Sequence, residues 1–139
     1  MTDASREWLK AYLAELETAG NKLLTQIYED ANGIPSTVVG GGSIGLAGYA
    51  LATQISVTTA NTEELVNLVV EHRAHAEKKL GPDAWPDVAF GALLHLACLY
   101  LEPAYRVTDT TDVDLRGAAQ QWWQTFADAI DANPEGSNA

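Results

Sequence analysis

The first residues that could carry chemistry are the glycines of an uncharged stretch, Ile34–Thr59. Gly40–Gly45, with the sequence GGGSIG, fits the GxGxxG pattern with which dinucleotide-binding proteins hold a pyrophosphate at the start of a helix. The overlapping pentapeptide that begins at Gly41 fits the GxSxG pattern, in which Ser43 would be a nucleophile on a strained turn. Both patterns need a sheet of several strands, so the neighbouring elements decide whether either chemistry is possible.

The histidines offer a second kind of chemistry. His72 and His75 stand three apart on an expected helix and could share a face as metal ligands. Because no third ligand stands at a characteristic spacing, two solvent-facing histidines are the favoured interpretation. His95 lies in a very apolar segment, where a hydrogen-bonded core histidine is commoner than a ligand. The single cysteine, Cys98, allows a reducing compartment and is expected to be a small core residue.

Two further groups could form sites near the C-terminus. Asp109, Asp112 and Asp114 suggest calcium, but their spacing is not that of an EF-hand loop, so we expect loop roles, with Asp112 or Asp114 capping the last helix. Trp122 and Trp123 diverge by about 100° on a helix. We therefore expect one of them to face the core and the other a partner, although a helix buried on two sides explains the pair equally well.

Composition limits the classes of partner. The chain has 139 residues, which suits one domain, and a formal net charge of −11 with only 8 Lys and Arg. Such a surface disfavours nucleic-acid binding and anionic membranes. The uncharged run Val38–Ser56 is diluted by glycine and polar residues, so we do not expect a transmembrane span.

The elements that would position these residues begin with a helix. Leucines and other apolar residues recur at three- and four-residue spacing over Thr2–Asn32, with Asp3 or Ser5 as its cap. Gly33 and Pro35 are expected to stop this helix.

The glycine-rich stretch itself is expected to be β-structure. Ser36–Val39 is short and β-branched, and from Tyr49 to Thr59 the sequence alternates with a period of two. A helix over Ser43–Thr53 is the competing interpretation, which its glycines weaken.

The remainder of the chain is expected to be helical. A capping box at Asn61 opens a helix over Thr62–Leu80, and Gly81 with Pro82 ends it. Val88–Leu101 is apolar almost all round and is predicted to be the centre of the core. A last helix follows over Leu115–Ala132.

These elements predict a mainly α fold: a bundle of about four helices with an inserted glycine-rich β-hairpin or arm at about 36–59. We expect a single domain, 1–139, made of an N-terminal helical segment (1–33), an uncharged β-arm (34–60), a helical core (61–132) and a flexible tail (133–139). At most two strands are then available, and the segment after the glycines alternates like a strand. Neither catalytic pattern has its sheet, so we expect no enzyme, catalytic residue, cofactor or metal.

An uncharged hairpin leaves strand edges that other chains can pair with. We therefore predict a homo-oligomer whose contacts use the arm and the tryptophan pair. The predicted interface residues are Val38, Val39, Tyr49, Leu51, Ile55, Val57, Trp122 and Trp123.

Residues Asn61–Ile130 resemble the small helical head–tail connector, or adaptor, proteins of tailed phages and viruses. The matching text is NTEELVNLVVEHRAHAEKKLGPDAWPDVAFGALLHLACLYLEP, followed by LRGAAQQWWQTFADAI. It reads as a capped helix, a proline-containing loop, a very apolar helix of the type PxxxxxAxxxLAxLY and a final helix. The resemblance implies a ring of identical subunits under the capsid portal, with portal and neck or tail proteins as partners and no catalysis.

The expected function is therefore that of a structural subunit located in the virion, assembled in the host cytoplasm, or otherwise of a cytoplasmic oligomer. Two alternatives stay open. One is a small nucleotide- or flavin-binding protein that uses the GGGSIG segment. The other is a membrane-active protein that inserts residues 38–57.

Overall fold

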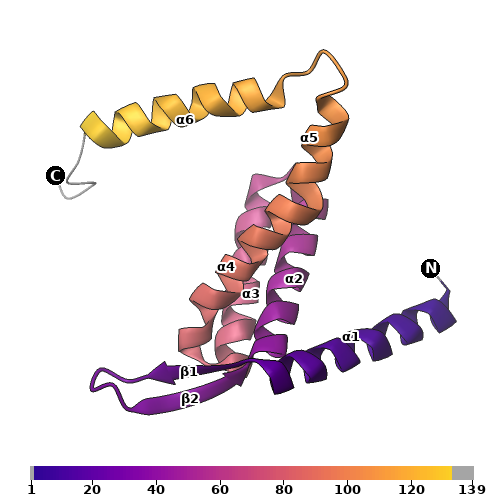
Figure 1. Cartoon of the computed structure of the whole chain (residues 1–139), viewed down its shortest axis with the longest axis vertical. Helices are drawn as coiled ribbons and strands as arrows, with labels where there is room; N and C mark the ends of the chain where they lie inside the picture. Colours follow the sequence, from indigo (N-terminus) through magenta and orange to yellow (C-terminus); the bar gives the residue numbers. More distant parts are fainter. Residues whose placement is uncertain (1, 133–139) are drawn as a thin grey trace. The chain divides into compact units, whose positions relative to one another are not determined.

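The structure is a computed structural model that describes residues 2–132. The chain divides into two compact units, Met1–Ala97 and Cys98–Ala139. The expected flexible tail, 133–139, lies outside the described residues. As predicted, the fold is mainly α-helical with an inserted antiparallel β-hairpin (Figure 1).

The first unit contains the hairpin and the helices around it. The helices are α1 (Asp3–Leu23), α2 (Gly41–Thr58), α3 (Thr62–Leu80) and α4 (Trp85–His95), with a 3-10 turn, η1 (Pro82–Ala84), before α4. The strands are β1 (Thr25–Glu29) and β2 (Pro35–Gly40). A π-helical segment, η2 (Leu96–Leu101), contains the boundary between the units, and the second unit continues with α5 (Glu102–Thr108) and α6 (Leu115–Ala132).

Local signals set several helix ends as predicted. Asn61 Oδ1 accepts a hydrogen bond from the Glu64 backbone N–H at 3.1 Å and caps α3. Gly81 ends that helix with φ 97°, a conformation that favours glycine. Before α6, Asp114 Oδ1 accepts from the Gly117 N–H at 2.8 Å, which confirms one of the two predicted caps.

The predicted N-terminal helix is too long. α1 ends at Leu23, and the chain continues as β1, which pairs antiparallel with β2 and places Ile27 opposite Val38. Ile27 lies four residues after Leu23, so its apolar spacing fits a helix as well as a strand. The start also differs from the prediction, because the side chain that caps α1 is Thr2, which accepts from the Ser5 N–H at 3.1 Å.

The predicted strand from Tyr49 to Thr59 is wrong, because those residues up to Thr58 belong to α2. This helix buries Gly48, Leu51 and Ala52, and Ile55 packs against the same cluster. These positions recur at helical spacing and form one face against α4. The alternation of small and large residues was therefore coincidental, and packing on α4 decides the structure.

α2 is the centre of the first unit, since it contacts α1, α3 and α4 (Figure 1). The core cluster consists of Leu51, Ala52 and Ala92, with five partly buried side chains packed around it: Ile55, Leu68, Val69, Trp85 and Leu96. A Cβ added at Gly48 would lie 3.0 Å from the Val88 carbonyl oxygen, so α2 and α4 touch through this glycine.

The helix predicted to be the centre of the core, Val88–Leu101, buries only a narrow face. Val88 and Ala92 are buried in the first unit. Phe90, Leu93 and Leu94 are exposed on the same helix. The prediction failed because a helix that is apolar all round is normally covered all round, and here the chain covers one side.

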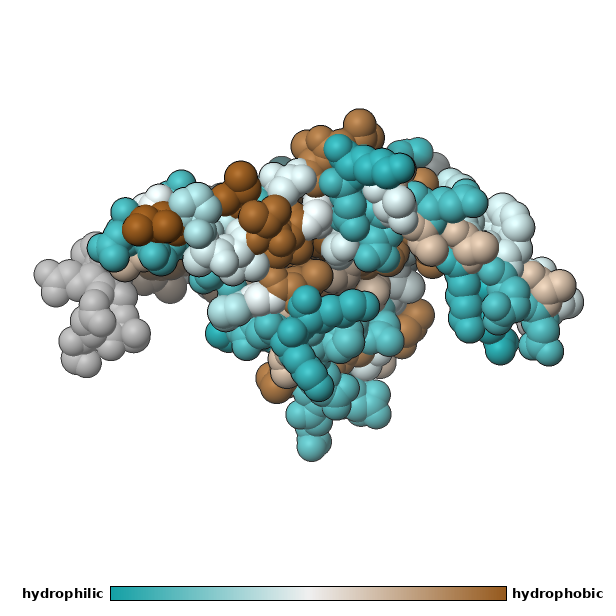
Figure 2. Space-filling view, turned by 90° about the horizontal axis from the view of Figure 1, so that it is seen from below, coloured by the Kyte–Doolittle hydropathy of each residue, from teal (hydrophilic) through white to brown (hydrophobic). Residues whose placement is uncertain are grey.

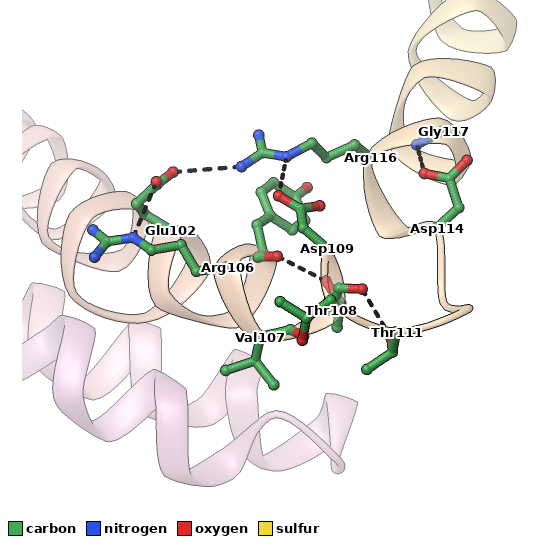
Figure 3. Close-up of polar contacts among 11 residues, drawn as sticks. Glu102, Arg106, Val107, Thr108, Asp109, Thr111, Asp114, Arg116 and Gly117 are labelled. Atoms are coloured by element: carbon green, nitrogen blue, oxygen red, sulfur yellow. Dashed lines mark hydrogen bonds and ion pairs between the residues drawn. The ribbon is translucent and has the colours of Figure 1, made fainter.

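The second unit is a pair of helices held together by polar contacts (Figure 3). Arg116 of α6 lies 3.8 Å from Glu102 and 3.3 Å from Asp109, and its guanidinium stacks 4.4 Å from the Tyr105 ring centroid. Among its described residues, 98–132, none is buried. Cys98, predicted to be a core residue, is free and exposed.

One helical stretch, Pro82–Thr108, is apolar and long enough to cross a membrane when judged by length and composition. Only 17% of its most apolar window is buried. Core helices of soluble proteins pass the same test, so this property is weak evidence for a membrane span.

Candidate functional site

The glycine-rich segment forms the junction between β2 and α2. β2 ends at Gly40, and α2 begins at Gly41. The Gly41 N–H donates to the Leu24 carbonyl oxygen at 2.7 Å, and the Ser43 N–H donates to Asn21 Oδ1 at 2.9 Å. Both acceptors belong to the end of α1 or the residue after it, so the preceding helix caps the first turn of α2.

Steric contacts explain why this junction contains glycine. A Cβ added at Gly42 would lie 2.1 Å from the Glu17 carbonyl oxygen. A Cβ at Gly20 would lie 2.7 Å from the Gly42 Cα atom, and one at Gly40 would lie 2.0 Å from Asn21 Oδ1. The glycines therefore allow α1 and α2 to cross at backbone contact.

This geometry bears on the dinucleotide pattern. The strand, glycine turn and helix that the pattern needs are present, contrary to our expectation that a strand would follow the glycines. However, β2 pairs antiparallel with β1, and within residues 2–132 there is no parallel strand beside it. Backbone and side-chain atoms of α1 also occupy the space over the first turn where a pyrophosphate would sit.

Ser43 has structural partners. Its hydroxyl donates to Glu17 Oε1 at 2.9 Å, and the Asn21 side-chain amide donates to Ser43 Oγ at 3.1 Å. Ser43 is the third residue of α2 and lies on a regular helical turn, with no positive φ recorded at any described non-glycine residue. The strained elbow of a hydrolase nucleophile is therefore not formed here.

A small cavity of about 260 Å³ lies beside this junction in the first unit. Its polar lining includes Glu17, Ser43, His72, His75 and Lys79. Within the described part of the chain, no three or more His, Cys, Asp or Glu side chains are grouped so that they could hold a metal ion.

His72 is half-buried, and its Nε2 donates in a short hydrogen bond to Gln54 Oε1 of α2. Burial lowers the pKa of His72, the nearby His75 lowers it further, and Glu71 opposes the shift. His95 stacks edge-on against Tyr49 at 5.5 Å between ring centroids.

An apolar hollow with a volume of about 410 Å³ lies between α1 and α2, and we call it the α1–α2 groove. Its apolar walls are Leu9, Tyr12, Leu13, Leu16, Leu46 and Tyr49, with Gly42, Gly45, Glu17 and His95 completing the lining. A Cβ added at Gly45 meets no atom within 4 Å, so the groove is open at this point. The leucine stripe was visible in the sequence, but its pattern could not show that the chain leaves it uncovered.

The predicted interface residues fall into two groups. Val39 and Leu51 are buried, and Ile55 packs on the core cluster, so these side chains stabilise the chain itself. Their role at an interface stays a prediction, although Val39 and Leu51 expose only 7% and 3% of their surface in the folded chain. The other members are exposed: Val38, Tyr49, Val57, Trp122 and Trp123.

Both tryptophans are exposed, although their side chains point in different directions from α6. Trp122 is 64% exposed and Trp123 is 66% exposed, so neither faces a core as predicted. The Trp122 ring lies 5.8 Å from that of Phe126, one turn later, and Ile130 extends the same side of α6. We call Trp122, Trp123, Phe126 and Ile130 the α6 aromatic face.

Exposed apolar side chains are therefore a general property of this chain. Figure 2 shows hydrophobic residues, in brown, gathered between hydrophilic ones on the face that it presents.

Comparisons of the chain with protein-family models, curated proteins and solved structures found no match. The geometry alone therefore supports any proposal about function.

Proposed function

We propose that this protein is a non-enzymatic structural subunit that assembles with copies of itself. The observation that carries the proposal is the second unit, whose described residues, 98–132, include no buried side chain. Helices in proteins owe most of their stability to the packing of an apolar face, and none of the 18 residues of α6 is buried. Its aromatic face must bury apolar area against another surface to be stable.

The charge distribution supports self-association through these surfaces. Copies that each carry a net charge of −11 repel one another wherever carboxylates meet. α2 contains no charged residue, and neither does the stretch Gly117–Ala127 of α6. These are surfaces that can approach a second copy without placing like charges together.

Within this class, we infer that the subunit is a head–tail connector of a virus particle, present as a homo-oligomeric ring. The order of elements from α3 to α6 supports this inference. A capped helix, a proline-containing turn at η1, an apolar helix and a terminal helix follow one another as in that family. Its partners would be portal and neck or tail proteins, and its location the virion.

The mass of the purified full-length chain in solution tests the assembly proposal. Light scattering and sedimentation over a hundredfold concentration range should give a discrete multiple of the 14.9 kDa chain mass. Negative-stain images of that species should show closed rings. A monomer at every concentration would overturn the proposal, and an oligomer of open, non-ring form would overturn the connector assignment alone.

Membrane association is the second candidate, favoured by the stretch Pro82–Thr108. Exposed Phe90, Leu93 and Leu94 could enter the acyl region. Flotation of the chain with neutral phosphatidylcholine liposomes tests it, because charge repulsion from the lipid is absent. Protein that stays at the bottom of the gradient would exclude this candidate.

A further inference from the structure

We propose that the α6 aromatic face of one subunit docks into the α1–α2 groove of the next. This inference rests on the proposed self-assembly and names the two surfaces that join. This chain carries both surfaces: the four side chains of the α6 aromatic face are 55–66% exposed, and the α1–α2 groove is an apolar hollow in the first unit. A contact between two different patches of identical subunits is heterologous, and such contacts close into rings when the rotation permits.

The two surfaces match in length. The groove is lined along α1 from Leu9 to Glu17. The aromatic face runs along α6 from Trp122 to Ile130. Each interval covers about 12 Å at the helical rise of 1.5 Å per residue. Two turns of α6 can therefore lie along the groove as a helix-in-groove contact with anchors one turn apart.

The two surfaces also match in charge. Phe126 lies at the middle of the aromatic face, and at about 100° per residue Asp128 and Asp131 point to the opposite side of α6. They remain in solvent when Phe126 enters the groove. The groove has a single carboxylate, Glu17, which already accepts a hydrogen bond from Ser43. Docking therefore buries aromatic area without bringing two free carboxylates together.

Gly45 supplies a variant that blocks the groove without harming the fold. Its Cβ position is open, and it lies inside α2, where any non-glycine residue other than proline improves helix propensity. Gly45→Leu should therefore fill the hollow from its floor. Gly91→Leu is the matched control, since Gly91 is also helical with an open Cβ position and does not line the groove.

The α6 aromatic face is disrupted by a double substitution, Trp122→Gln with Phe126→Gln. Both side chains are exposed and have no core to support. Gln124→Ala is the control on the opposite side of the same helix, about 160° from Phe126. We expect Gly45→Leu and the double variant to be monomeric by light scattering, while both controls keep the mass of the unmodified protein.

Mixing the two defective proteins tests the inference directly. The Gly45→Leu subunit keeps its α6 aromatic face, and the doubly substituted subunit keeps its α1–α2 groove. One contact of the proposed kind can therefore form between them. We expect a heterodimer of twice the chain mass. It cannot add further subunits, because its free groove is blocked and its free α6 face lacks the two aromatic side chains. A mixture that stays monomeric, or single variants that keep the assembled mass, would overturn the docking while leaving the proposed assembly in place. If the unmodified protein is itself monomeric, the proposed function fails first.

Discussion

Asn21 Oδ1 accepts a hydrogen bond from the Ser43 backbone N–H at 2.9 Å, although the two residues are 22 positions apart. An N-cap acceptor normally comes from the residue just before a helix, but the residue in that position is Gly40, which has no side chain. α1 therefore supplies the cap for α2. The same contact joins the two helices that line the α1–α2 groove.

Replacing Asn21 with alanine should destabilise the chain by about 1 kcal/mol, the usual cost of losing a helix N-cap. Chemical denaturation followed by far-UV circular dichroism measures the change. Lys22→Ala is the matched control, because it is the next residue of α1 and its side chain is exposed. An equal loss of stability in both variants would mean that the cap contributes nothing specific.

Gly42→Ala should be much more damaging than any other glycine substitution in α2. The new methyl group would lie 2.1 Å from the Glu17 carbonyl oxygen, so α1 and α2 must separate. Overpacking of this kind costs about 3 kcal/mol. Gly45→Ala, in the same helix but with open space around its Cβ position, should stabilise by about 0.5–1 kcal/mol through helix propensity.

Thermal unfolding of both variants tests these opposite changes in stability. The melting temperature should fall for Gly42→Ala and rise for Gly45→Ala. Tolerance of alanine at Gly42 would show that the two helices do not cross as closely as the structure has them.

The sequence allowed the helix-rich class and the later helices to be predicted, because their signals are local. Asn61, Gly81 and Asp114 act on backbone groups within three or four residues, and such signals are readable in a single chain. The prediction for the glycine junction was wrong because the residues that contact these glycines lie far from them in the sequence. Nothing near Gly42 in the sequence indicates that Glu17 will lie against it.

The candidate surfaces were only partly predictable for a related reason. Apolar spacing shows that Leu13, Leu16 and Phe126 lie on apolar faces, but not which faces the chain itself covers. Leu51 and Val57 both looked suited to an interface. Packing against α4 buries the first, whereas the second is 82% exposed.

The hairpin is tied to the helices by one side-chain contact that can be removed cleanly. Tyr28 of β1 donates its hydroxyl hydrogen to Asp87 Oδ2 of α4. Tyr28→Phe keeps the ring and removes this bond, which should cost about 1 kcal/mol. Tyr12→Phe, on an exposed ring that stacks on Trp8, is the control and should leave stability unchanged.

The same contact predicts an alkaline limit to stability. Burial raises the pKa of Tyr28 above its ordinary value near 10, and the hydrogen bond to Asp87 and the charges of Asp87 and Asp83 raise it further. The folded state therefore holds this proton more tightly than the unfolded state. Its contribution is complete below pH 10 and is lost as the pH rises further, so Tyr28→Phe should flatten the fall in melting temperature above pH 10. An identical alkaline fall in both proteins would contradict this role.

His72 predicts the opposite dependence at acidic pH. Burial lowers its pKa, as does the neighbouring His75, so the folded state resists protonation more than the unfolded state does. The unfolded chain then binds more protons as the pH falls through the ordinary histidine value of about 6.5, and stability declines until the folded pKa is passed. The melting temperature should therefore drop between pH 7 and pH 5 more steeply in the unmodified protein than in His72→Gln. His75→Gln is an informative second variant, because it removes a group that lowers the pKa of His72 and should therefore make the decline smaller and end at a higher pH. A decline of the same size and midpoint in all three proteins would assign the acid sensitivity to other groups.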